Sequence, residues 1–129
     1  MPNVSSGINL DSNFLNLKAI ELKEVRPEVE KLLVEGEEII SAFKTVRDQV
    51  IFTNNRIFVV NVKGVTGKKV AYFSYPYSKI QYYGIETAGF LDIDSELILT
   101  FSNGHMLQFD FKSNVDIRKI NSLISKYVL

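Results

Sequence analysis

The sequence predicts a mainly β domain with helix (α+β), in which a curved antiparallel sheet leads into a C-terminal helix. Two turn signals, Asn54-Asn55 and Asn103-Gly104, each separate two runs of strand-forming residues, as in β-hairpins. The last part of the chain instead places apolar residues at helical spacing. Because the strands follow one another with short links, we expect an antiparallel meander.

Two short helices are expected before the sheet. Apolar residues recur near helical spacing from Phe14 to Val34, and Pro27 divides this run, because proline is tolerated only in the first turn of a helix. We therefore predict helices over about 12–20 and about 26–35, the second ending at Gly36. On this interpretation, 1–35 is a helical segment packed on a domain formed by 36–129.

Seven strands and a closing helix are expected after Gly36. The predicted strands are 37–47, 49–53, 56–62, 69–75, 80–86, 96–101 and 106–111. Pro76 marks a break or an edge, because proline cannot donate to a sheet ladder. Ser113 and Asp116 have the spacing of a capping box for the last helix. The apolar stripe of that helix is Ile117, Ile120, Leu123, Ile124 and Tyr127.

Composition excludes several classes of protein. The 129 residues are 46% hydrophobic, which permits a packed core, and the 15 basic residues balance the 15 acidic ones, so binding to nucleic acid is not favoured. There is no Cys and one His, which removes thiolate chemistry and the usual zinc sites. The first residues do not show a charged start followed by an apolar run, and the apolar stretches are far shorter than a membrane span, so we expect neither a secretory leader nor a membrane-spanning helix. We expect a soluble, cytoplasmic protein without a cofactor.

Several segments between Gly36 and Leu129 carry a family resemblance. In order they are Arg47-Asp48, Phe52-Thr53-Asn54-Asn55-Arg56, Gly64-Val65-Thr66-Gly67-Lys68-Lys69, Tyr75-Pro76-Tyr77-Ser78-Lys79-Ile80, Glu86-Thr87-Ala88-Gly89 and Asp92-Ile93-Asp94-Ser95-Glu96-Leu97. Together they resemble the bacterial pleckstrin-homology (PH) family. The resemblance implies a PH-like barrel of four-stranded and three-stranded sheets closed by the last helix. It also implies a closed homo-oligomeric ring, and it implies no defined ligand.

Two segments with basic residues can be considered as anion-binding sites. The run Gly64-x-x-Gly67-Lys68-Lys69 has the wrong glycine spacing for a nucleotide-binding P-loop, which leaves Lys68 and Lys69 as candidate anion contacts. The junction of the first two strands, Arg47-Asp48-Gln49, is nearly neutral, so specific phosphoinositide binding is not favoured. We expect Arg47, Asp48 and Arg56 to form a charge network that stabilises a turn or an interface.

Acidic residues form a second candidate group: Glu86, Asp92, Asp94 and Glu96. Alternating carboxylates occur in calcium loops, but the glycine and the distant glutamate that such loops need do not fall correctly here. We expect turn hydrogen bonds or a polar rim at a subunit contact, and no metal. His105 follows a hairpin turn and has no neighbouring nucleophile, so it is expected to be an exposed turn residue.

Neighbouring apolar residues on several strands point to a second covering layer. The pairs are Ile39-Ile40, Ile51-Phe52, Val59-Val60 and Tyr82-Tyr83, and adjacent residues of a strand face opposite sides. The N-terminal helices can cover part of this surface, and a neighbouring subunit can cover the rest. The sequence therefore predicts a non-enzymatic interaction module that self-assembles and could bind a protein partner. The alternative is a peripheral domain that binds anionic lipid or phosphate through Lys63, Lys68 and Lys69.

Overall fold

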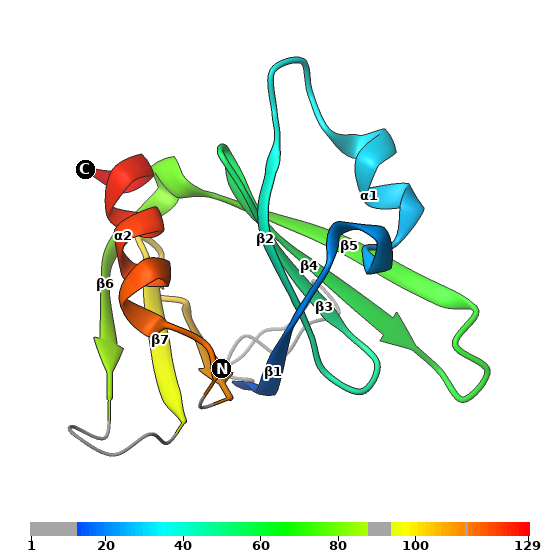
Figure 1. Ribbon diagram of the computed structural model, residues 1–129. Coiled ribbons are helices and arrows are strands. Elements are labelled where there is room, and N and C mark those ends of the chain that lie inside the picture. Colours follow the sequence, from blue (N-terminus) through cyan, green and yellow to red (C-terminus); the bar gives the residue numbers. More distant parts are fainter. Residues whose placement is uncertain (1–12, 88–93, 113) are drawn as a thin grey trace. The chain divides into compact units, whose positions relative to one another are not determined.

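The computed structural model describes residues 13–87, 94–112 and 114–129 (Figure 1). The elements are β1 (Asn13–Ile20), η1 (Leu22–Glu24), α1 (Pro27–Leu32), β2 (Ile39–Lys44), β3 (Gln49–Thr53), β4 (Arg56–Lys63), β5 (Lys69–Pro76), η2 (Tyr77–Lys79), β6 (Ile80–Glu86), β7 (Ser95–Phe101), β8 (Met106–Phe111) and α2 (Ile117–Val128). They form two compact units. The first contains the residues up to Lys18 together with Tyr77–Leu129, and the second is Ala19–Pro76.

The second unit is an antiparallel sheet with strand order β5-β4-β3-β2. The segment that contains η1 and α1 packs on it, through a core of Val25, Val29, Ala42, Ile51, Phe58 and Val60. Gln49 fixes this segment to β3, since its side chain accepts from the Arg26 N–H at 3.1 Å and donates to the Glu24 carbonyl at 2.9 Å. Pro27 occupies the first turn of α1, where its missing N–H costs nothing.

Strands β3 and β4 are buried on both faces, as the paired apolar residues predict. Ile51 and Val60 belong to the core beneath α1, whereas Phe52 makes an edge-on contact with Phe43 at 5.7 Å between ring centroids. The side chains of Ile51, Phe52, Val59 and Val60 are all fully buried within this chain. On β2, by contrast, Ile40 is exposed.

The first unit has the strand order β1-β8-β7-β6, with β1 parallel to β8 and the other pairs antiparallel. Helix α2 packs against β6, β7 and η2. The predicted stripe faces this sheet, because Ile117, Ile120 and Ile124 are buried and Tyr127 stacks on Tyr77 at 5.5 Å. No helix in the described parts of the chain has the length and apolarity needed to cross a membrane.

The helix predicted over 12–20 is wrong, because this segment is strand β1. Phe14 and Leu17 both point into the core and pair with Phe109 and Phe111, although inward residues of a regular strand are two apart. An irregularity between them, with Asn16 at a φ of 57°, adds one residue to the spacing. The resulting interval of three residues looks helical in the sequence.

Two other expectations are corrected. The described residues form eight strands rather than seven, and β5 and β6 each pair on one side only, so strand pairing does not close a barrel. Helix α1 is shorter than the predicted 26–35. Ser113 lies outside the described residues, and Asp116 itself caps α2, because its side chain accepts from the Arg118 N–H at 3.1 Å.

The remaining strands match their predicted bounds to within a few residues, and Pro76 is the last residue of β5. Strand β8 alternates as expected, with Leu107, Phe109 and Phe111 buried. Tyr82 and Tyr83 face opposite sides of β6. Tyr82 is 60% exposed, whereas the Tyr83 hydroxyl lies 2.6 Å from the Ser125 hydroxyl on α2.

Candidate functional site

A forked ion pair lies at one end of the second unit. Arg56, the first residue of β4, donates from Nε to Glu37 Oε2 at 2.8 Å and from Nη2 to Glu37 Oε1 at 2.7 Å. The Glu37 side chain is fully buried, and that of Arg56 is 19% exposed. The guanidinium also lies 4.2 Å from the centre of the Phe58 ring. Such planar, two-bonded pairing is the strongest arrangement available to an arginine and a carboxylate.

Further hydrogen bonds complete this ion pair. Glu37 accepts from the Thr53 hydroxyl at 2.7 Å and from the Val34 N–H at 3.0 Å. Arg56 also donates to the Leu32 carbonyl at 2.7 Å. Burial alone would raise the pKa of Glu37, but the hydrogen bonds from Arg56, Thr53 and Val34, with the charge of Arg56, leave its pKa below the usual value. The pair thus fixes the chain that leaves α1 against the sheet.

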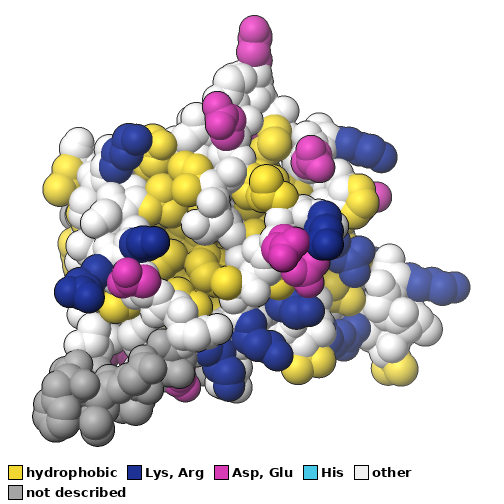
Figure 2. Space-filling view, in the orientation of Figure 1, with side chains coloured by type: hydrophobic (Ala, Val, Ile, Leu, Met, Phe, Trp, Pro, Cys, Tyr) yellow, Lys and Arg dark blue, Asp and Glu magenta, His cyan; other side chains and the backbone are white. Residues whose placement is uncertain are grey.

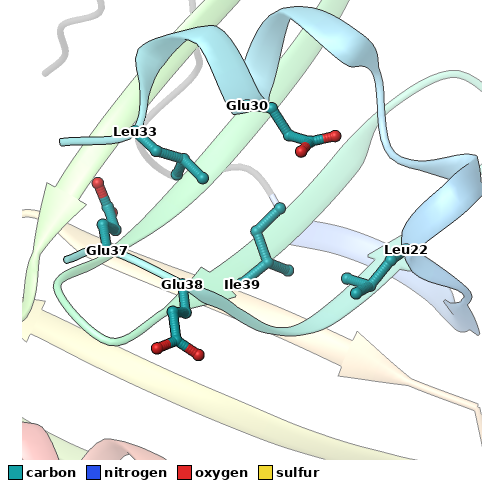
Figure 3. A pocket seen from close by; sticks show the side chains of 6 residues that line it. All are labelled: Leu22, Glu30, Leu33, Glu37, Glu38 and Ile39. Atoms are coloured by element: carbon teal, nitrogen blue, oxygen red, sulfur yellow. The ribbon is translucent and has the colours of Figure 1, made fainter. Parts of the chain in front are cut away.

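A hollow of about 310 Å³ opens beside this ion pair, between α1 and the start of β2 (Figure 3). We call it the α1–β2 hollow, and it is lined by Leu22, Glu30, Leu33, Glu37, Glu38 and Ile39. Figure 3 shows Leu22, Leu33 and Ile39 directed into the space and Glu38 directed away from it. The hollow therefore has apolar walls and, with Glu37 neutralised by Arg56, two exposed acids at its rim: Glu30 and Glu38.

Basic and apolar residues gather at the other end of this sheet. We call this end the basic tip, formed by the β2–β3 and β4–β5 turns, with Val46, Arg47, Lys63, Val65, Lys68 and Lys69. Val46 and Val65 are fully exposed. Arg47 donates from Nη2 to the Gly64 carbonyl, which joins the two turns. Figure 2 shows Lys and Arg side chains together with hydrophobic ones over this end of the unit, at the lower right.

Asp48 supports the basic tip rather than a charge network with Arg56. Its carboxylate accepts from the Val62 N–H at 2.9 Å and from the Asn61 side-chain amide at 3.4 Å. The structure therefore does not bring Arg47, Asp48 and Arg56 together: the first two lie at the tip, and Arg56 lies at the opposite end of β4. Lys68 and Lys69 are exposed at the tip, and their role as anion contacts stays a prediction.

Glu37 was not predicted from the sequence as the partner of Arg56. Glu37 lies between a helix and a strand, where neither the 3.6-residue period of a helix nor the two-residue period of a strand predicts which way its side chain points. One signal was available. Two adjacent acids, Glu37-Glu38, precede an apolar strand, and a carboxylate that enters a buried environment needs a cation. Nothing in the sequence identified which of three nearby arginines supplies it.

Two of the predicted acids on the first unit, Glu86 and Glu96, lie in one row with Asp110, which was not predicted as a site residue. Glu86, Glu96 and Asp110 occupy directly paired positions on β6, β7 and β8. Burial, a hydrogen bond with Glu86 and the charges of Asp110 and Glu86 raise the pKa of Glu96. An open hollow of about 220 Å³ lies beside them, lined by Glu86, Thr87, Asp94 and Glu96.

This acidic row offers no metal site in the part of the chain that the structure describes. Gln108 donates to Asp110 at 2.9 Å and so satisfies one carboxylate oxygen. Asp92 lies outside the described residues. His105 is an exposed turn residue, as expected, with its Nδ1 3.0 Å from the Asn103 amide nitrogen.

The sequence matches the bacterial PH domain family over residues 9–128. The chain therefore belongs to that family, and the match spans most of the N-terminal segment as well as the sheet. A Bacillus subtilis (strain 168) relative, the uncharacterised protein YjqA, is 35% identical over 118 residues, which cover 90% of this chain and 94% of that protein.

Two crystal structures share the architecture. A DUF1696 family protein with a pleckstrin-homology domain from Shewanella loihica PV-4 matches with a TM-score of 0.78 and 34% identity, covering 89% of this chain and 99% of that chain. A pleckstrin homology domain from Shewanella amazonensis SB2B matches with a TM-score of 0.65 and 38% identity, covering 85% and 90%. The fold is therefore PH-like, as the resemblance implied.

Proposed function

We propose that this PH-like domain is a non-catalytic interaction module that assembles with copies of itself into a closed ring. The observation that carries the proposal is the apolar surface around the α1–β2 hollow. Leu22 is 61% exposed, and Leu32 and Val34 on the same segment are exposed to 45% and 57%. Each buried Å² of such surface is worth about 25 cal/mol, so a contact that covers these side chains is favourable. Apolar and aromatic side chains are typical of interface centres.

The described residues also support a non-catalytic role. The single histidine is exposed on a hairpin turn and contacts an amide rather than a nucleophile. The strongest ionic interaction, between Arg56 and Glu37, has its hydrogen-bonding capacity directed at the protein's own backbone and side chains. A group engaged in this way holds the fold together and is not available to a substrate.

Light scattering coupled to size-exclusion chromatography tests the assembly. A protomer has a mass of 14.7 kDa, and we expect a discrete multiple of this mass at micromolar concentration. Leu22→Ser with Val34→Ser should lower the mass, whereas Tyr82→Ser, which removes an exposed apolar residue from the first unit, should leave it unchanged. A 14.7 kDa species at every concentration would overturn the proposal.

A second candidate function, contact with an anionic lipid surface, is favoured by the basic tip. Exposed valines flanked by Arg47, Lys63, Lys68 and Lys69 combine an apolar group with cations, as lipid-binding surfaces do. Co-sedimentation with phosphatidylserine vesicles at low and high salt tests this function. Salt-sensitive binding that Lys68→Glu with Lys69→Glu removes would support it, and equal sedimentation with neutral and anionic vesicles would contradict it.

A further inference from the structure

We propose that the basic tip of one copy docks into the α1–β2 hollow of a second copy. This inference rests on the proposed self-assembly and adds the two surfaces that meet. Each copy carries one tip and one hollow, so the contact is head-to-tail. Such a contact leaves a free tip and a free hollow on every dimer, and it generates a ring when the rotation between neighbours closes.

A copy cannot fill its own hollow with its own tip. Arg56, at the start of β4, bonds to Glu37 in the wall of the hollow, and Lys63, at the end of β4, begins the turn that carries Val65. The eight residues of β4 separate the two sites by roughly 23 Å, at about 3.3 Å per residue. The tip is therefore presented outward, where another copy can reach it.

The charges of the two surfaces are complementary. From Glu21 to Glu38, which includes most of the walls of the hollow, seven acidic residues stand against three basic ones, and one of the seven, Glu37, is neutralised by Arg56. The two turns of the tip carry four basic residues and one acid, Asp48, which is engaged by the Val62 N–H. Among the described residues, neither the rim acids Glu30 and Glu38 nor the tip lysines form an ion pair. A contact between the surfaces would supply both groups with partners.

The shapes and polarity also fit. The hollow of about 310 Å³ holds roughly ten times the ~30 Å³ that a water molecule occupies in the liquid. It therefore has room for a branched aliphatic side chain, and its walls include Leu22, Leu33 and Ile39. Val46 and Val65 are fully exposed at the tip and have no apolar cover within the described structure. Docking would remove apolar surface from water on both sides.

The tip is held in shape before it binds. The Arg47–Gly64 hydrogen bond joins its two turns, and Gly64 and Gly67 adopt φ values of 79° and 69°, which favour glycine. The Gly67 N–H donates to the Gly64 carbonyl at 3.3 Å and closes the turn. Little conformational freedom is then lost on docking, which favours the bound state.

Two variants and their mixture test this contact. The tip variant is Val65→Asp with Lys68→Glu, and the hollow variant is Leu22→Asp with Glu30→Lys. All four side chains are exposed, so circular dichroism should show the wild-type fold. We expect each variant alone to be a 14.7 kDa monomer by light scattering. A 1:1 mixture should give a dimer of about twice the 14.7 kDa protomer mass and nothing larger, because only one functional tip and one functional hollow can meet.

A matched control is Lys119→Glu, an exposed charge reversal on α2, which should keep the wild-type mass. If the wild type is oligomeric and either variant keeps its mass, the docking inference is overturned while self-assembly stands. Monomeric variants whose mixture stays monomeric would also overturn head-to-tail docking. A tip variant that keeps its oligomeric mass but loses binding to phosphatidylserine vesicles would assign the tip to lipid instead. A monomeric wild type would overturn the proposed function itself, together with docking.

Discussion

The Glu37 carboxylate accepts two parallel hydrogen bonds from the Arg56 guanidinium, although the two residues are 19 positions apart in the chain. The pair lies where the chain leaves α1 and approaches β2, and it also reaches the Leu32 carbonyl. One ion pair therefore connects the short helix, the first residues before β2 and the start of β4. The walls of the α1–β2 hollow depend on this connection.

Removing the charge of Glu37 should destabilise the protein strongly. Glu37→Gln keeps the side-chain shape but leaves Arg56 without its counter-ion, and breaking a buried pair typically costs about 3–5 kcal/mol. Urea unfolding should show a clearly lower midpoint. Glu38→Gln, an exposed neighbour, should change stability by less than about 0.5 kcal/mol. Equal midpoints for the two variants would show that the forked pair contributes little.

The same carboxylate predicts a dependence of stability on pH. The pKa of Glu37 is lower in the folded protein than its ordinary value of 4.5, so the unfolded chain binds the proton more readily. This contribution to stability is complete at pH values above 4.5 and is lost as the pH falls through the folded-state pKa. Urea titrations from pH 7 downward should therefore show a smaller acid-induced loss in Glu37→Gln than in wild type. A parallel decline in both proteins would contradict the assignment.

The acidic row should oppose folding at neutral pH. The pKa of Glu96 is raised in the folded state, so its contribution favours folding at low pH and is lost as the pH rises from 4.5 through the raised value. Glu96→Gln should therefore stabilise the protein at pH 7 by about 0.2–1 kcal/mol, the range for cross-strand charge pairs. The gain should shrink near pH 4. Glu28→Gln on α1 is the control, and destabilisation by Glu96→Gln at pH 7 would refute the prediction.

The left-handed backbone of Asn16 should govern which residues β1 accepts. At a φ of 57°, a β-branched side chain is strained, and the left-handed conformation costs about 1–2 kcal/mol for ordinary residues. Asn16→Val should lower the free energy of unfolding by about that amount, whereas Asn16→Gly should be neutral or stabilising. Lys18→Val, at an exposed position on the same strand, separates this effect from side-chain polarity. Equal losses for Val and Gly at position 16 would argue against the bulge.

Regular alternation made much of the fold predictable from the sequence. Strand β8 and the Asn103-Gly104 turn were located because each inward residue of the strand, such as Phe109, is followed by an outward one. Strand β1 could not be predicted, since its bulge gives Phe14 and Leu17 helical spacing. A covering layer on β3 and β4 was anticipated from Ile51-Phe52, but the sequence does not reveal that the segment with η1 and α1 supplies it on the face that carries Ile51.

The sequence indicated the basic residues of the tip, but it did not indicate the α1–β2 hollow. Lys68 and Lys69 stand out because they follow a glycine-rich turn. The α1–β2 hollow depends on the forked pair that holds Glu37 inward, and pairing over 19 residues follows from packing rather than from local sequence. Arg56 was assigned the wrong neighbours for the same reason, since Asp48 is closer to it in the chain than Glu37.

The parallel pairing of β1 with β8 also constrains the order in which the parts of the protein can fold. Asn13 pairs with Gln108, and the rings of Phe14 and Phe109 stack at 5.3 Å, so these partners lie near opposite ends of the chain. During synthesis the first strand leaves the ribosome long before its partner exists. Such distant contacts slow folding, because the entropy of closing a long loop must be lost before they form. A ribosome-bound chain halted before β8 should therefore expose β1 to proteases, even where the β2–β5 sheet is already complete.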